Sequence, residues 1–252
     1  MAANHPGSIR LDELLVARGL FPSRSRARDA ILRGTVTVAG RVATKAGEPV
    51  RPDAEPAVAD PARTYVSRAA LKLIAALDHF ALDPAGAEAL DIGASTGGFT
   101  QILLERGASH VTALDVGHGQ LHRNIAADPR VTNMEGRNVR DLKKSDLGER
   151  IPDFLVSDVS FISLKLALPP ALQLAAPGTR AVFLVKPQFE AGREAIGKGG
   201  LLRDRSEGER IANDLRGWLD RQPGWRALGL VSSPIEGGDG NREYLLAGMK
   251  DR

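Results

Sequence analysis

The chain contains no cysteine among its 252 residues, and this absence excludes several kinds of protein. It removes disulfides, cysteine-ligated zinc, iron–sulfur clusters and every mechanism that uses a cysteine nucleophile. A protein without disulfides fits a reducing compartment, so we expect a cytoplasmic location. Hydrophobic residues make up 42% of the chain, which is enough to bury a full core, and we therefore do not expect a disordered protein.

Long hydrophobic runs are also absent. No apolar stretch approaches the roughly 20 residues that a membrane-spanning helix needs. The first residues, MAANHPGS, lack a cationic patch followed by an apolar core, so we expect no secretory signal. We expect neither a membrane partner nor a bound metal, and the sequence indicates no oligomeric state.

Positive charge is present but unevenly distributed. The net charge is only +3, yet residues 10–45 carry eight basic side chains against three acidic ones. Such a concentration suggests a polyanionic partner, either nucleic acid or an anionic membrane face, and an ordinary solvated surface is the alternative. The basic residues are Arg10, Arg18, Arg24, Arg26, Arg28, Arg33, Arg41 and Lys45.

The N-terminal part of the chain has the pattern of a small separate module. Helical spacing predicts helices over 11–19 and 23–34, with Ser23 as the N-cap of the second. Alternation over 35–47 predicts a hairpin that turns near Ala39-Gly40. Four prolines between residues 46 and 61 then predict a strand end or a linker before a larger module.

This module resembles a known RNA-binding domain. The stretch RLDELLVARGLFPSRSRARDAILRGTVTVAGRVATKAGEPV is similar to the S4 domain, found in ribosomal protein S4 and in several pseudouridine synthases and tyrosyl-tRNA synthetases. The resemblance implies a small α+β domain over 9–62 that binds structured RNA through its arginine-bearing helix. We expect residues 1–8 to form a disordered tail, residues 63–66 a linker, and residues 67–252 a second domain.

The second part alternates between short apolar strands and helices. This order predicts an α/β fold, a doubly wound Rossmann-like sheet that binds ligands at the carboxyl ends of its strands. In the first helix we expect Leu71, Ile74 and Leu77 to face inward. Helices are expected over 67–80, 99–107, 164–175 and 209–222, and strands over 89–93, 110–117, 153–161, 180–190, 225–233 and 243–250.

A glycine-rich turn in ALDIGASTGGFT, residues 89–100, predicts a ligand site. It lacks the lysine of a phosphate-binding P-loop, and its spacing does not match the GxGxxG of dinucleotide sites. A third ligand, S-adenosylmethionine, needs close backbone approach and two acids. Asp91 before the turn and Asp115 at the end of the next strand can supply them. An ordinary tight turn of an α/β protein is the alternative.

Two further absences in the sequence exclude some acceptors of the methyl group that S-adenosylmethionine donates. An Asn/Asp-Pro-Pro-aromatic loop, common in amine methylation, is missing, since the corresponding position reads SDVSF. Carbon-5 methylation of cytosine needs a cysteine. A hydroxyl acceptor would instead need lysines and carboxylates that converge on one oxygen. Four such residues lie near predicted strand ends or the first helix, although each by itself is more often structural: Lys72, Asp158, Lys186 and Glu243.

Five motifs in order carry a second resemblance: YVSRAALKL, DIGASTGGFT, SDVSFISL, VKPQFEAGREAIGKGGLLRD and GNREYLL. They resemble an FtsJ-type ribose 2′-O-methyltransferase fused behind an S4 domain, as in the TlyA (hemolysin A) family. The resemblance implies a class I S-adenosylmethionine-dependent methyltransferase fold and methylation of cytidine ribose in 16S and/or 23S ribosomal RNA. The alternatives are a non-catalytic ribosome assembly factor tethered by its S4 domain, and a membrane-active hemolysin.

The resemblance also implies roles for individual residues. Lys186 would orient the 2′-hydroxyl and lower its proton affinity, Asp158 would pair with Lys186 and face the methyl donor, and Lys72 with Glu243 would position the ribose. Lys198, in the glycine-rich loop 197–204 that we expect to be mobile, would contact an RNA phosphate. The residues expected to bind the cofactor are Asp91, Gly93, Ala94, Ser95, Gly97, Gly98, Phe99, Asp115, Asn138 and Asp158.

Two positions depart from the family pattern. The interdomain tetrapeptide is Arg63-Thr64-Tyr65-Val66, with tyrosine where tryptophan is common. Ala69-Ala70 replaces the Gly-Gly that more often precedes the first lysine, and we expect this change to stiffen the helix.

Overall fold

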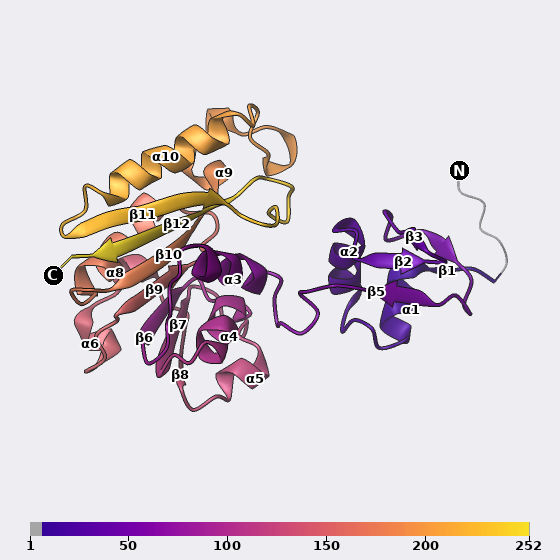
Figure 1. Ribbon diagram of the computed structural model, residues 1–252, viewed down its shortest axis with the longest axis horizontal. Helices are drawn as coiled ribbons and strands as arrows, with labels where there is room; N and C mark the ends of the chain where they lie inside the picture. The colour runs from indigo at the N-terminus through magenta and orange to yellow at the C-terminus, as the bar shows by residue number, and fades with distance from the viewer. Residues whose placement is uncertain (1–6, 252) are drawn as a thin grey trace. The chain divides into compact units, whose positions relative to one another are not determined.

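The computed structural model describes residues 7–251 and divides into two compact units after Thr64. Six of the eight residues expected to form a disordered tail lie outside the described residues, and the chain already forms a strand at Ile9. The N-terminal unit contains, in order, β1 (Ile9–Arg10), α1 (Leu11–Ala17), α2 (Arg24–Leu32), β2 (Val36–Val38), β3 (Arg41–Val42), β4 (Pro49–Val50) and β5 (Pro56–Val58) (Figure 1).

Two helices pack on short antiparallel strands in the N-terminal unit. Leu11 and Leu15 of α1 and Ile31 of α2 are fully buried in one core, because their spacing puts them on the inner helix faces. The hydroxyl of Ser23 accepts a hydrogen bond from the amide of Arg26, which confirms the predicted N-cap. The expected hairpin also forms between β2 and β3.

The proline-rich stretch is part of this unit. It contributes β4, which pairs with β1, and β5, which pairs with β2 at the edge of a three-stranded sheet of order β3-β2-β5. Proline is tolerated in such edge strands because it removes only an amide that has no ladder partner there. The stretch therefore ends the first unit before the chain enters the second.

The C-terminal unit is built on a seven-stranded sheet of order β11-β12-β10-β9-β6-β7-β8. All adjacent pairs are parallel except those of β12, which runs antiparallel to β10 and β11. The strands are β6 (Glu88–Ile92), β7 (His110–Asp115), β8 (Val131–Glu135), β9 (Phe154–Ser157), β10 (Arg180–Val185), β11 (Trp225–Ser232) and β12 (Tyr244–Lys250).

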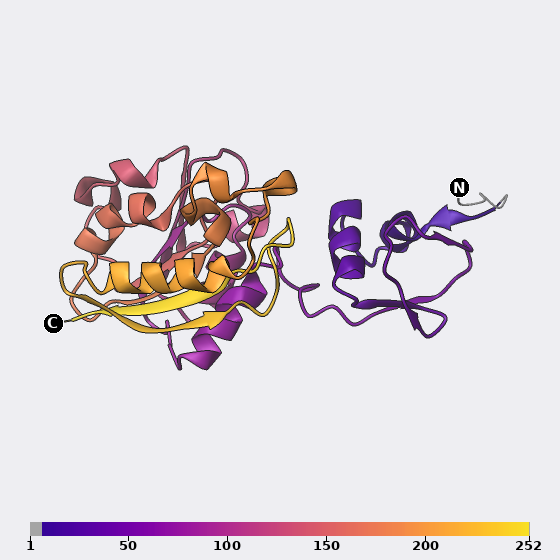
Figure 2. The same ribbon diagram turned by 90° about the horizontal axis from the view of Figure 1, so that it is seen from above.

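Helices cover both faces of this sheet (Figures 1 and 2). Alternate strand residues point to opposite faces, so Phe183 belongs to one core and Leu184 to the other. One face packs on α3 (Ala70–His79) and α4 (Gly98–Glu105), and the other packs on α7 (Leu164–Ala167), α8 (Pro169–Leu174) and α10 (Glu207–Leu219). The doubly wound α/β architecture is therefore confirmed. None of the described helices is long and apolar enough to cross a membrane.

Several predicted boundaries were wrong for local reasons. Strand β10 ends at Val185 rather than residue 190, because Pro187 starts the short helix α9 (Pro187–Glu190). The single helix expected over 164–175 is interrupted at Leu168, before Pro169. Strand β8 was not predicted, because its half-exposed residues at the sheet edge have no clear apolar alternation. The short helices α5 (Arg123–Ala126) and α6 (Lys144–Leu147) were not predicted either.

The inward face of α3 was predicted in part incorrectly. Leu77 is buried as expected, but Leu71 and Ile74 are only partly buried, and Leu73 with Ala76 occupies the core instead. Every position from 69 to 77 except Lys72 is apolar, so spacing alone does not choose the inner face. The actual rotation of α3 buries Lys72, a result with consequences for the site.

The order of the strands creates a crevice. Strand β6 has β7 on one side and β9 on the other, so the chain connections leave the sheet in opposite directions at this point. Open α/β sheets bind ligands at such a switch point, outside the carboxyl ends of the strands. The glycine turn after β6 and the SDVSF segment after β9 both lie there.

Candidate active site

In the turn between β6 and α4, two glycines allow the backbone to pack closely against neighbouring segments of the chain. Gly93 has a φ of +82°, and a Cβ atom there would lie 3.1 Å from the backbone nitrogen of Val159. Gly98 allows a second close approach, because its Cβ would lie 2.9 Å from the Cβ of Ser67. The glycines are thus required by close packing of the turn against the segments after β9 and before α3.

A hollow of about 550 Å³ opens beside this turn, within the usual range for small-molecule sites. Five of the expected cofactor residues line it: Gly93, Ser95, Asp115, Asn138 and Asp158. A smaller hollow of about 70 Å³ shares Gly93, Ser95 and Asp158 with the first, and is also lined by Ala94, Gly98 and Phe99. The two adjoining hollows therefore bring together eight of the ten expected residues.

Asp91 and Gly97 are the two that line neither hollow. Asp91 is fully buried beneath the turn, where its Oδ2 accepts a hydrogen bond of 2.6 Å from the hydroxyl of Thr100 in α4. Its Oδ1 has no hydrogen-bond partner among the described residues. The pKa of Asp91 is raised to about 7, chiefly because the carboxyl is buried and also because the Asp158 carboxylate is near, while the hydrogen bond from Thr100 opposes the shift.

Asp115 stands at the carboxyl end of β7 with both oxygens engaged. Its Oδ2 accepts from the amide of Ser95 at 2.8 Å, and its Oδ1 accepts from the amide of Gly117 at 2.7 Å. This acid therefore joins the glycine turn to the loop that follows β7. Val116, the next residue, lines the hollow and is 70% exposed, so it presents an apolar surface there.

Lys186 and Asp158 form an ion pair at the carboxyl ends of neighbouring strands. The Nζ of Lys186 lies 2.7 Å from Oδ1 of Asp158 and donates a 2.7 Å hydrogen bond to the hydroxyl of Ser160. The two side chains are only 11% and 17% exposed, and Asp158 lines both hollows. A partly buried lysine needs such partners, and here they fix its ammonium beside the hollow.

Lys72 and Glu243 form a second, more deeply buried ion pair. The Nζ of Lys72 on α3 donates to Oε2 of Glu243, and the two side chains are 6% and 3% exposed. Val185 pairs with Tyr244 in the antiparallel β10–β12 ladder. Lys186, which follows Val185, and Glu243, which precedes Tyr244, are therefore the next two facing positions at this end of the strands. The antiparallel register thus brings the two ion pairs to the same edge of the sheet.

Some residues of the site were not found by sequence reasoning. Ser160 accepts a hydrogen bond from Lys186. The large hollow is also lined by Gln120 and Arg137, and Glu135 holds the loop after β7 through hydrogen bonds to its backbone. Ser160 lies within the SDVSF motif, so its position next to Asp158 was a usable signal. Gln120 and Glu135 lie in stretches without apolar periodicity, and nothing in the sequence marks them.

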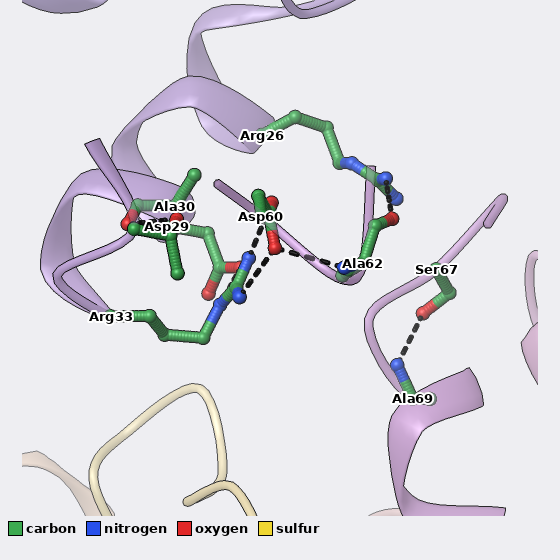
Figure 3. Close-up of polar contacts among 9 residues, drawn as sticks. Arg26, Asp29, Ala30, Arg33, Asp60, Ala62, Ser67 and Ala69 are labelled. Carbon is green, nitrogen blue, oxygen red and sulfur yellow. Dashed lines mark hydrogen bonds and ion pairs between the residues drawn. The ribbon is translucent and has the colours of Figure 1, made fainter. Parts of the chain in front are cut away.

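The expected RNA-binding arginines of the N-terminal unit fall into two groups. Arg33 is only 14% exposed and forms a bidentate ion pair with Asp60, at 2.7 and 2.9 Å (Figure 3). Arg26 is half-buried and donates to the carbonyl of Ala62. These two guanidinium groups hold the end of the N-terminal unit on α2, and their role in RNA binding stays a prediction.

The remaining basic side chains are accessible. Arg10 and Arg24 both pair with Asp12 of α1 yet stay about half exposed, at 47% and 54%. Arg28 and Lys45 are exposed and make no ion pair with another described residue. Arg41 pairs with Glu48, and Arg18 donates to the carbonyl of Pro52.

The glycine-rich loop expected to be mobile contains Lys198, which is exposed. Asn241 ties this loop to the segment that carries Glu243, since its side-chain amide donates to the carbonyl of Gly200 at 2.9 Å and its oxygen accepts from the amide of Leu202 at 3.2 Å. Among the described residues, no group of three or more acids or histidines could hold a metal ion.

A doubly wound sheet with a glycine turn, two strand-end acids and paired lysines defines the class of Rossmann-like methyltransferases. In agreement, the FtsJ-like methyltransferase family matches residues 65–250, and the S4 domain family matches residues 9–55. The chain therefore belongs to the TlyA family of S4–FtsJ proteins, also named hemolysin A.

Individual relatives are similar over almost the whole chain. The 16S/23S rRNA (cytidine-2′-O)-methyltransferase TlyA of Mycobacterium tuberculosis is 44% identical over 94% of this chain and 88% of its own. Hemolysin A of Brachyspira hyodysenteriae is 40% identical over 94% of this chain and 98% of its own. A solved Streptococcus thermophilus structure that carries the hemolysin name is 40% identical, with a TM-score of 0.75, and covers 97% of this chain and 89% of its own.

Proposed function

We propose that this protein transfers a methyl group from S-adenosylmethionine to the 2′-hydroxyl of a cytidine in ribosomal RNA. One observation carries the proposal: the ion pairs Lys186–Asp158 and Lys72–Glu243 lie at one edge of the sheet, and Asp158 of the first pair lines a hollow of suitable size. The relatives named as rRNA (cytidine-2′-O)-methyltransferases support the choice of acceptor.

The residues of the hollow fit the methyl donor. Gly93 lines the hollow without a Cβ atom, so the donor can approach its backbone closely, and Asp115 offers carboxylate oxygens to ribose hydroxyls. Asn138 and Val116 supply a polar and an apolar contact for the base. When bound there, S-adenosylmethionine supplies an electrophilic methyl carbon on a sulfonium centre.

The lysines and acids would act on the acceptor. Lys186 is held by Asp158 and Ser160, so its ammonium can point at the ribose 2′-oxygen and stabilise the negative charge that develops as the hydroxyl proton passes to solvent water. The 2′-oxygen then forms a bond with the methyl carbon as the bond from that carbon to sulfur breaks. Lys72 and Glu243 would keep the ribose in line for this displacement.

The N-terminal unit would hold the RNA. Its accessible cations, Arg10, Arg18, Arg24, Arg28, Arg41 and Lys45, are suited to phosphate contacts. Lys198 would add a contact beside the active site. Arg26 and Arg33 are assigned instead to the stability of the unit, because their guanidinium groups are already engaged with Ala62 and Asp60.

Methyl-labelled donor and purified ribosomal subunits test this function. The wild-type protein should label RNA on a cytidine ribose, whereas Lys186→Ala should lower the rate about 10²- to 10³-fold and still bind donor and RNA. Lys144→Ala, a change at an exposed lysine of α6, is the matched control and should keep full activity. Labelling by Lys186→Ala at the wild-type rate would remove Lys186 from the mechanism, and labelling of a base would refute the ribose acceptor.

A further inference from the structure

One carboxylate organises the loop between β7 and α5. The side chain of Glu135, at the end of β8, accepts hydrogen bonds from three successive backbone amides: Gly119 at 2.8 Å, Gln120 at 2.7 Å and Leu121 at 2.9 Å. Hydrogen bonds from Leu121 and Gly119 lower the pKa of Glu135 to about 2, so the group is ionised throughout the physiological range. A charged acceptor binds several amides more strongly than a neutral one.

The loop that Glu135 holds forms part of the wall of the large hollow. Gln120 lines the hollow, and its Oε1 accepts a hydrogen bond of 3.2 Å from the hydroxyl of Ser95 in the glycine turn. Asp115 makes the parallel connection through the backbone amides of Ser95 and Gly117. Two hydrogen-bonded connections therefore join the glycine turn to the loop after β7 at the rim of the hollow beside Asp115, and one of them depends on the position of Gln120.

A second contact between the same segments has a different physical origin. Gly136, next to Glu135, has a φ of +70°, and a Cβ atom there would lie 2.4 Å from Nε2 of His118. The amide of Gly136 also donates to the carbonyl of Gly117 at 2.8 Å. The end of β8 thus supports the loop through charge at one residue and through the absence of a side chain at the next.

We propose that Glu135 is a positioning residue for the methyl donor, acting through loop 117–121 to hold Gln120 on the rim of the hollow beside Asp115. The proposal rests on the proposed function and extends it to the part of the donor that meets Asp115, its ribose. Neither Glu135 nor Gly136 lines the hollow, so neither contacts the donor directly. Their effect is on the affinity of the donor and not on the transfer step at Lys186.

The test compares Glu135→Gln, Gly136→Ala and Gln120→Ala in the full chain. Glutamine keeps one acceptor oxygen and loses the charge, so it cannot satisfy three amides. All three variants should raise the dissociation constant of S-adenosylhomocysteine, measured by calorimetry, and the donor KM by about tenfold or more. The kcat at saturating donor and the KM for RNA should change less than about twofold. Glu149→Gln, an exposed acid before β9, should match wild type.

The outcomes separate this proposal from the proposed function. An unchanged donor affinity in Glu135→Gln, or a lowered kcat with unchanged donor KM, would overturn the role of Glu135. Gln120 is exposed, so Gln120→Ala should fold normally and reports on the rim even if the other two variants fold poorly. Donor affinity at the wild-type level in Gln120→Ala would also overturn the proposal. A wild-type protein that binds no donor would overturn the proposed function as well.

Discussion

Lys72 and Glu243 lie 171 residues apart in the sequence, yet the lysine ammonium donates a hydrogen bond directly to the glutamate carboxylate. Helix α3 packs over β10 and β12, and both partners of the ion pair are almost fully buried. The first helix of the C-terminal unit is thereby joined to the residue just before the last strand, at the active-site edge. Burial of the pair has consequences for stability that are separate from its role in catalysis.

Removal of either partner should destabilise the C-terminal unit. Lys72→Met leaves the Glu243 carboxylate buried without its cation, and Glu243→Leu leaves the ammonium, so each should cost about 3 to 5 kcal/mol. The double variant should cost clearly less than the sum of the two, since no buried charge is left unpaired, and it should still be inactive. Urea unfolding followed by the fluorescence of Trp218 and Trp225, both in this unit, measures the effect. Additive losses in the double variant would show that the two side chains are not coupled.

The pKa of Asp91 predicts a pH dependence of stability. In the folded protein its pKa is raised from an ordinary value of 3.8 to about 7. Between these values the folded state binds more protons than the unfolded state, so stability should fall as pH rises from about 4 to about 7 and then level off. Asp91→Asn should remove this loss, on the order of a few kcal/mol, in unfolding measured without ligand. A wild-type pH profile that Asp91→Asn does not alter would contradict the buried, protonated carboxyl.

Arg33 and Arg28 should behave in opposite ways. Arg33→Ala leaves Asp60, whose side chain is 2% exposed, without its bidentate partner. It should destabilise the N-terminal unit by about 2 to 4 kcal/mol, seen as faster amide hydrogen exchange over residues 9–60. Arg28→Ala should leave that exchange unchanged, weaken RNA binding and lower the slope of log K against log salt by about one. Unchanged exchange in Arg33→Ala would assign this arginine to the RNA surface after all.

Much of the fold could be predicted because periodicity and turn chemistry act locally. The alternation of short apolar strands with helices indicated a doubly wound sheet, and Ser23 indicated the start of α2. These local rules failed where contacts with segments distant in the sequence determine the structure. The rotation of α3 depends on the strands beneath it, and β8 is a strand because it pairs with β7 at the sheet edge, not because its residues alternate.

The sequence by itself determined the kinds of chemistry that are available, since it contains no cysteine, no P-loop lysine and no GxGxxG, and it places acids after apolar strands. Strand order and register, which depend on pairing between distant segments, decided which charges meet. They put Lys186 beside Asp158 and buried Lys72 against Glu243. They also paired Arg33 with Asp60, whereas a count of positive charges in the sequence does not distinguish Arg33 from the exposed Arg28. A charge is read from one residue, but its partner and its burial are properties of the whole packed chain.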